Sequence, residues 1–221
     1  MNNIITAVVP VRAGSQRVKN KSTRSFAGTT LLDIKLSMLS GIKTIDNIVV
    51  STDCPTAKKI AKKYGVSIHE RDPYYASSEC TNSEFFENMA EYVASGSILY
   101  SPCTAPLIKE STYYDFINRY SLSKTKNLVT TSLVKEHLWL EGKPINYKVN
   151  DSPNTQDLPD IMSINYGLSI ISRELLLKNK NIVSATPNFY LLEDLEGVDV
   201  DTPLDFKFAE FLYNTRGISF D

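Results

Sequence analysis

Residues 4–10 read Ile-Ile-Thr-Ala-Val-Val-Pro, a short apolar run rich in β-branched residues. Polar residues do not alternate along this run, which is typical of a strand buried on both faces of a sheet. A polar, basic segment follows at 11–28, and residues 31–39 then carry the apolar spacing of a helix. A buried strand, a loop and a helix in this order predict the first unit of a mostly parallel α/β sheet.

The same alternation of strands and helices continues along the chain. We expect further strands at 47–52, 66–68, 97–100, 127–132 and 167–172, and further helices at 55–64, 83–94, 110–120 and 203–213. Residues 136–162 interrupt this pattern with Gly142 and three prolines, and we interpret them as an excursion from the core. The sequence contains no internal repeat or flexible linker, which predicts a single domain over 1–221.

The composition of the 221-residue chain argues against several classes of protein. Lysine and arginine number 24 against 25 aspartates and glutamates, whereas nucleic-acid-binding proteins usually carry a basic surplus. No apolar run approaches about 18 residues, so we expect no membrane-spanning helix. The N-terminus lacks the charged segment of a signal peptide, and we expect a cytoplasmic protein. Three widely spaced cysteines disfavour a disulfide framework and a zinc site.

The loop after the first strand concentrates positive charge where parallel sheets bind ligands, beyond the carboxyl end of a strand. Its four cations are Arg12, Arg17, Lys19 and Lys21, and it also contains Gly14 and Ser15. Cationic side chains and the N–H groups of a glycine turn both bind phosphate oxygens. Neither of the two common glycine-rich phosphate fingerprints occurs in the sequence. From spacing alone, the loop is either a triphosphate cradle or a solvated basic turn.

Two acidic residues near the C-terminus, Asp199 and Asp201, lie two positions apart. In an extended segment both side chains point to one side, where a divalent cation would relieve their repulsion. The alternative is a polar strand end in which Asp201 or Thr202 caps the helix that Pro203 opens. Taken alone, the residues favour the cap.

Four segments in order resemble a known family. Residues 7–17, Ala-Val-Val-Pro-Val-Arg-Ala-Gly-Ser-Gln-Arg, resemble the opening of the acylneuraminate cytidylyltransferases, the CMP-sialic acid synthetases and their relatives. The segments Ile-Val-Val-Ser-Thr-Asp (48–53), Thr-Ala-Pro-Leu (104–107) and Val-Asp-Val-Asp-Thr-Pro-Leu-Asp (198–205) are similar to later blocks of that family. Arg12, Gly14, Ser15 and Lys21 fall on matching positions, whereas Gln16 and Ser22 depart from the family's usual Lys and Asn. The resemblance spans almost the whole chain.

The resemblance implies a Rossmann-like three-layer nucleotidyltransferase domain, with residues 136–162 as a protruding dimerisation arm of a homodimer. It implies transfer of CMP from CTP to an anionic acceptor with release of pyrophosphate, and it implies that Asp199 and Asp201 hold Mg²⁺. The implied catalytic residues are Arg12, Lys21 and Asp201, and the implied nucleotide-binding residues are Arg12, Ala13, Gly14, Ser15, Lys21 and Arg71.

Acceptor binding is assigned by the same resemblance to Gln156 and Asn165, which lie in segments similar to the family's acceptor-facing block. The alternative is that both side chains make ordinary loop and strand-edge hydrogen bonds. Thr155 stands where sialic acid enzymes carry a carboxylate-binding arginine, and Tyr166 replaces a glycine. A substitute cation such as Lys135 or Lys148 would have to meet the carboxylate of a sialic acid.

Three functions therefore remain open at the level of sequence. The first is a cytidylyltransferase acting on a nonulosonic, sialic-acid-like or related sugar acid for surface polysaccharide. The second keeps the chemistry but uses a phosphonate or a phosphorylated small molecule, as loss of the arginine suggests. The third is a non-catalytic nucleotide-binding module, which the joint presence of Arg12, Lys21, Asp199 and Asp201 argues against.

Overall fold

Seven strands form one sheet in the computed structural model, which describes residues 4–215, and their order is β11-β7-β10-β6-β1-β4-β5. They are β1 (Ile5–Val11), β4 (Asn47–Thr52), β5 (Ser67–Glu70), β6 (Ser97–Tyr100), β7 (Asn127–Val134), β10 (Ile161–Ser172) and β11 (Asn188–Leu191). Every pairing is parallel except those of β10 with β6 and with β7. The prediction of a mostly parallel sheet is confirmed.

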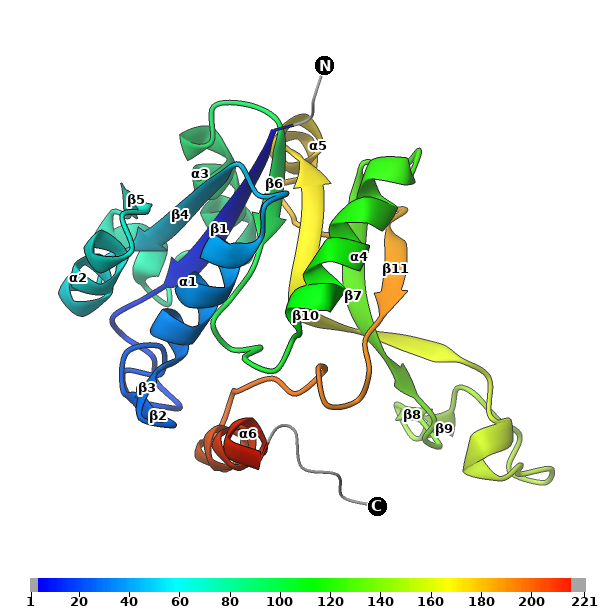
Figure 1. Cartoon of the computed structure of the whole chain (residues 1–221). Coiled ribbons are helices and arrows are strands. Elements are labelled where there is room, and N and C mark those ends of the chain that lie inside the picture. The colour runs from blue at the N-terminus through cyan, green and yellow to red at the C-terminus, as the bar shows by residue number, and fades with distance from the viewer. Residues whose placement is uncertain (1–3, 216–221) are drawn as a thin grey trace.

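Helices cover both faces of the sheet and give a three-layer domain (Figure 1). They are α1 (Leu31–Gly41), α2 (Pro55–Lys63), α3 (Asn82–Tyr92), α4 (Glu110–Leu122), α5 (Arg173–Asn179) and α6 (Pro203–Thr215). Apolar residues of α1, α2, α4 and α6 join one buried cluster, whereas those of α3 and α5 join a second one. The sheet therefore separates two apolar layers, and it is β1 at the centre that is buried along nearly all its length.

The strongest patterns in the sequence give the elements that agree best with the structure. Strands β4 and β6 have the predicted bounds, and each predicted helix overlaps an observed one. The short elements α5 and β11 were not predicted, nor were the two-stranded hairpins β2–β3 (Ser25–Phe26 and Thr29–Thr30) and β8–β9 (Trp139–Leu140 and Lys143–Pro144). Strand β10 begins at Ile161, six residues before the predicted start, because its first part pairs with the end of β7.

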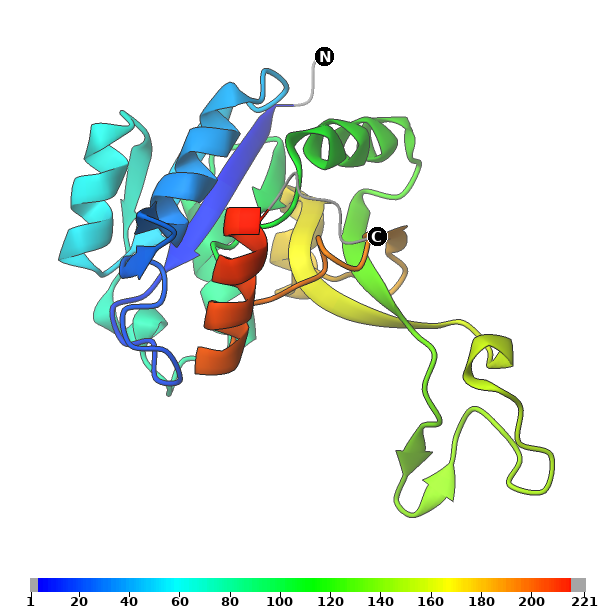
Figure 2. The ribbon, with the colours of Figure 1, turned by 60° about the horizontal axis from the view of Figure 1, so that its bottom comes forward.

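Residues 136–162 leave the body between β7 and β10 and project from it as an arm (Figure 2). The arm contains the hairpin β8–β9 and a short 3-10 helix, Thr155–Asp157. At its neck Lys135 forms an ion pair with Asp160, 2.7 Å between Nζ and Oδ1, and also donates to the Leu158 carbonyl. Large apolar side chains on the arm are exposed: Trp139, Leu140, Ile145 and Val149.

Among residues 4–215, no helix is both long and apolar enough to cross a membrane.

Candidate active site

The basic loop begins at the carboxyl end of β1 and is fixed to the end of the neighbouring strand. The backbone N–H of Ala13 donates to Asp53 Oδ1, 2.9 Å away, and Asp53 directly follows β4. Arg12 and Gly14 are exposed. A Cβ placed on Gly14 would meet no heavy atom within 4 Å, so the glycine leaves open space beside the loop. Because Asp53 already accepts the Ala13 N–H, this amide is less available to a phosphate than sequence reasoning assumed.

The basic loop and the late acids meet, although some 180 residues separate them in sequence. Lys21 Nζ lies 3.2 Å from Asp201 Oδ1 and also donates to the Val200 carbonyl. Arg17 contacts the other carboxylate oxygen of Asp201 at 3.0 Å. Opposite charges from the two segments therefore lie together at the carboxyl edge of the sheet, where sequence reasoning placed a nucleotide.

Asp201 does not cap the last helix. Asp205 Oδ2 accepts the N–H groups of Asp201 and Thr202, at 3.1 and 2.7 Å, and the Thr202 hydroxyl accepts the Asp205 N–H. Thr202 and Asp205 thus satisfy the first turn of α6, and these N–H donors hold the pKa of Asp205 below its usual range. The carboxylate of Asp201 is left to face cations, so the capping alternative is wrong for Asp201 and correct for Thr202.

Asp199 is the less solvated of the two acids. Burial raises the pKa of its carboxyl group, and the nearby charge of Asp201 adds to the rise, while Thr104 and Lys21 oppose it. The backbone also ties this segment to the loop after β6, since the Val200 N–H donates to the Thr104 carbonyl at 2.8 Å. A partly desolvated carboxylate beside a second carboxylate is a donor set that fits Mg²⁺, which takes one or two carboxylates together with phosphate oxygens.

Arg71 lies just beyond the end of β5 and is only 7% exposed. Its terminal nitrogen donates to the Val11 carbonyl at 2.7 Å, and its guanidinium carbon lies 5.0 Å from the centre of the Phe85 ring. Its Nε is buried and has no hydrogen-bond partner within the described part of the chain. Burial lowers the pKa of Arg71, with Asp53 opposing the shift. A buried unpaired donor of this kind is costly unless a ligand accepts from it.

The two residues assigned to the acceptor lie in different surroundings. Gln156 is exposed on the arm, and the structure does not bring it to the basic loop of its own chain. Asn165 lies in β10, and its amide oxygen accepts from Thr130 Oγ1 at 2.7 Å while its amide nitrogen donates to Ser132 Oγ at 2.9 Å. Asn165 thus makes the strand-edge hydrogen bonds that were its alternative role, and acceptor binding by either residue stays a prediction.

A buried lysine near the site was missed by sequence reasoning. Lys35 on α1 is fully buried and donates to the Ala105 carbonyl at 3.0 Å and to the Tyr113 hydroxyl at 2.8 Å. The same hydroxyl is hydrogen-bonded to Ser101 at 2.7 Å. Lys35 therefore braces the loop after β6 that also carries Thr104. The signal in the sequence was a lysine on the otherwise apolar face of a predicted helix.

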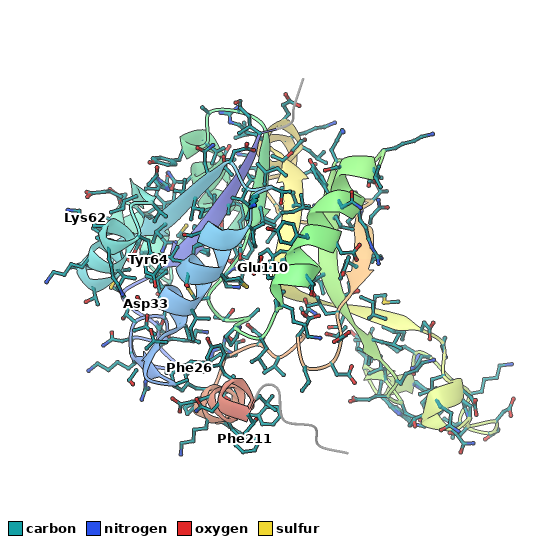
Figure 3. The ribbon with its side chains drawn as sticks, viewed as in Figure 1. Phe26, Asp33, Lys62, Tyr64, Glu110 and Phe211 are labelled. Atoms are coloured by element: carbon teal, nitrogen blue, oxygen red, sulfur yellow. The ribbon has the colours of Figure 1, made fainter. Side chains whose placement is uncertain are left out.

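A cavity of about 710 Å³ in the described chain is lined by other residues. It is bordered by α1, the start of α4 and the end of α6, with Asp33, Tyr64 and Glu110 among its lining residues (Figure 3). The loop cations, Arg71 and the late acids do not line it. This cavity is therefore distinct from the cluster of charges.

Residues 6–161 match the family model described as cytidylyltransferase. The chain is 23% identical to a post-translational flagellin modification protein B of Campylobacter coli, over 97% of each sequence. It is also 23% identical to the CMP-N,N'-diacetyllegionaminic acid synthase of Campylobacter jejuni, again over 97% of each.

The fold is shared with solved structures. A CMP:2-keto-3-deoxy-manno-octonic acid synthetase complexed with CTP superposes with a TM-score of 0.70 at 13% identity, covering 96% of this chain and 99% of that one. This likeness confirms the Rossmann-like nucleotidyltransferase architecture. Because the family model matches more than half of the residues, the chain belongs to the cytidylyltransferase family.

Proposed function

We propose that this protein transfers CMP from CTP to a nonulosonic or related sugar acid and releases pyrophosphate. The observation that carries the proposal is the meeting of Lys21 and Arg17 with Asp201 at the carboxyl edge of the sheet. The relative named for a CMP-activated legionaminic acid, similar over nearly its full length, supports the acceptor class. Since the reaction consumes CTP, we propose that the protein is located in the cytoplasm.

In the proposed reaction an acceptor oxygen attacks the α-phosphorus of CTP. A new oxygen–phosphorus bond forms, the bond from the α-phosphorus to the bridging oxygen breaks, and the electron pair leaves with pyrophosphate. An acceptor hydroxyl loses its proton to solvent in the same reaction. Such transfers depend mainly on positioning and on charge neutralisation. Arg12 and Lys21 supply positive charge to the phosphate oxygens, and the N–H groups of Gly14 and Ser15 donate to them. None of these roles requires a covalent nucleophile on the protein.

Arg71 is the proposed reader of the cytosine base. Cytosine presents acceptors at O2 and N3, and the unpaired Nε of Arg71 is a donor held rigidly by the Val11 carbonyl and the Phe85 ring. A buried donor that only the right base satisfies discriminates strongly, because the wrong base leaves it unpaired. We expect CTP to raise the melting temperature more than ATP or GTP does; equal shifts would contradict the assignment.

Mg²⁺ is the proposed metal, held by Asp199 and Asp201 together with phosphate oxygens of the nucleotide. The ion would supply positive charge that polarises the α-phosphate and offsets the charge of the approaching acceptor. With a metal on these carboxylates, Lys21 and Arg17 would be free in part to turn from Asp201 to the triphosphate. Removal of divalent ions with EDTA should abolish turnover, and added Mg²⁺ should restore it; full activity in EDTA would contradict the metal assignment.

A homodimer is proposed on the basis of two exposed apolar surfaces. The first is the arm, with Trp139 and Leu140 at its hairpin. The second lies on one face of the sheet at its β11 edge, where the pairing registers place exposed residues of three strands together. These residues are Phe189, Leu191, Leu133 and Met162. Exposed apolar area of this kind favours a protein partner over water.

The activity is tested by measuring pyrophosphate release with CTP, Mg²⁺ and a panel of acceptors. The panel contains N,N'-diacetyllegionaminic acid, an N-acylneuraminic acid, 2-keto-3-deoxy-manno-octonic acid, a phosphonate and a phosphorylated polyol. Turnover with a sugar acid, giving a CMP-linked product by mass spectrometry, is the expected result. Turnover with only the phosphorus-containing acceptors would establish the second candidate, which gains support because Lys135 is already paired with Asp160. Silence across the panel would favour a binding module.

A further inference from the structure

One residue at the catalytic edge stands in a backbone conformation that its side chain disfavours. Tyr166 has a φ of 53°, in the left-handed region, where the Cβ of a non-glycine residue strains the backbone. The strain sits in a bulge of β10: Ile164 pairs with Thr131 and Ser169 with Val129, so that residues 165–168 oppose Thr130 alone.

The bulge is held in place from both sides. Asn165 Oδ1 accepts the Gly167 N–H at 3.1 Å, and Thr130 Oγ1 accepts the Leu168 N–H at 2.9 Å. Gly167 has little room, because a Cβ there would lie 3.1 Å from Ile108 Cδ1. The surrounding structure thus fixes the backbone of the bulge. The tyrosine side chain at 166 does not cause this conformation, which is one that it disfavours.

The pairing register places Tyr166 at the edge where the charges gather. Strand β6 ends at Tyr100, which pairs with Ser169 of the antiparallel β10, so the residues just before Ser169 extend past the end of β6. Burial raises the pKa of the Tyr100 phenol, and Asp199 and, more weakly, Tyr166 add to the rise. Asp199 and Tyr166 therefore both lie near the end of β6. The Tyr166 residue is 50% exposed, so its ring is left out of the core.

The sheet order separates the two halves of the site. Arg71 and Arg12 follow β5 and β1, whereas β10 lies on the other side of β6. The segment with Asp199 is tied to the loop after β6, between these two halves. The nucleotide therefore takes the side of β1, β4 and β5, and the acceptor approaches the α-phosphate from the side of β10.

We infer that Tyr166 packs its ring against an apolar face of the acceptor, such as the C–H face of a sugar ring or an N-acyl methyl group, and so determines which acceptors bind. This inference rests on the function proposed above. A tyrosine ring supplies a large, rigid contact area at low entropic cost, which outweighs a modest backbone strain. Tyr166 is then a specificity residue whose removal affects the acceptor and not the nucleotide.

Tyr166→Gly is the informative variant, because glycine adopts this φ without strain. Relief of the strain should raise the melting temperature by roughly 2–4 °C. Loss of the ring should raise the KM of the acceptor by about tenfold or more, with N,N'-diacetyllegionaminic acid as the first probe, while the KM of CTP changes by less than about twofold. Tyr166→Phe, which keeps the ring, should remain within about threefold of the unmodified enzyme.

The matched control is Lys180→Gly, since Lys180 has a φ of 49° at the end of α5. It relieves a similar strain and should leave both KM values unchanged. An active enzyme whose acceptor KM is the same in Tyr166→Gly would overturn this inference alone. Failure of the unmodified enzyme to use any sugar acid would overturn the proposed acceptor class and this inference with it.

Discussion

Each carboxylate oxygen of Asp201 contacts one cation, Lys21 or Arg17, and these contacts predict the effect of a single substitution. Asp201→Asn keeps the size of the side chain and removes its charge, so we expect turnover to fall by about 10²–10³-fold. The ion pairs are partly solvent-exposed, so the free energy of unfolding should change by less than about 1 kcal/mol. Kinetics and urea denaturation check the two halves of this prediction.

Asp205→Asn serves as the control for that substitution. Its amide oxygen still accepts the N–H groups at the start of α6, and activity should stay within about threefold. Equal losses of activity in Asp201→Asn and Asp205→Asn would mean that the segment's fold, not the Asp201 charge, matters for turnover.

His69 is the second single residue with a measurable consequence. It is buried on β5, with Nδ1 3.1 Å from Ser51 Oγ and its ring stacked on Tyr92. Burial, with a contribution from Arg71, lowers the pKa of His69 in the folded protein. The unfolded chain then binds the proton more readily, so stability is full above about pH 6.5 and is lost as the pH falls from there toward the folded pKa.

We therefore expect the urea concentration at the unfolding midpoint to decrease as the pH is lowered from 7.5 to 5.5. The decrease should be smaller in His69→Gln. A His69→Gln profile that follows the unmodified protein throughout would remove His69 as the source.

At the scale of elements, Lys35 connects α1 to the loop between β6 and α4. Lys35→Met removes donors from the Ala105 carbonyl and the Tyr113 hydroxyl, and a buried polar group left unpaired costs about 1–3 kcal/mol. We expect a loss of stability of that size, and a lower kcat because the loop also positions Asp199 through Thr104. Lys43→Met, an exposed lysine beyond the end of α1, should change stability by less than about 0.5 kcal/mol.

The individual elements also show how much of the fold could be predicted from the sequence. Strands such as β4 and β6 are apolar runs bounded by turns, so their pattern is local and readable. Strand β11, Asn-Phe-Tyr-Leu, is four residues at a sheet edge with exposed apolar side chains, and it exists because β7 is there to pair with it. In the site, the charged residues of the basic loop and the late acids could be predicted from the sequence. The burial of Lys35 and the strained backbone of Tyr166 could not, because both result from packing between distant segments.

At the scale of the whole molecule, the arm and the uncovered sheet face predict self-association. The double substitution Trp139→Ser with Leu140→Ser removes exposed apolar area from the arm. We expect sedimentation velocity to show a dimer for the unmodified protein and a shift toward monomer for the variant. Leu122→Ser, at an even more exposed apolar position at the end of α4, should leave the association unchanged.

Strand β10 runs from the base of the arm at Ile161, past the bulge at Tyr166 on the carboxyl edge of the sheet, to Ser172 beside the start of β6. The same twelve residues are thus both the stem of the projection and a wall of the proposed acceptor side. A variant with a shortened or exchanged arm must therefore keep Lys135 and Asp160, which form the ion pair at its neck, and change only the residues between them. A deletion that extends into β10 would also disrupt the proposed acceptor side. The resulting loss of turnover would then be misread as a loss of self-association.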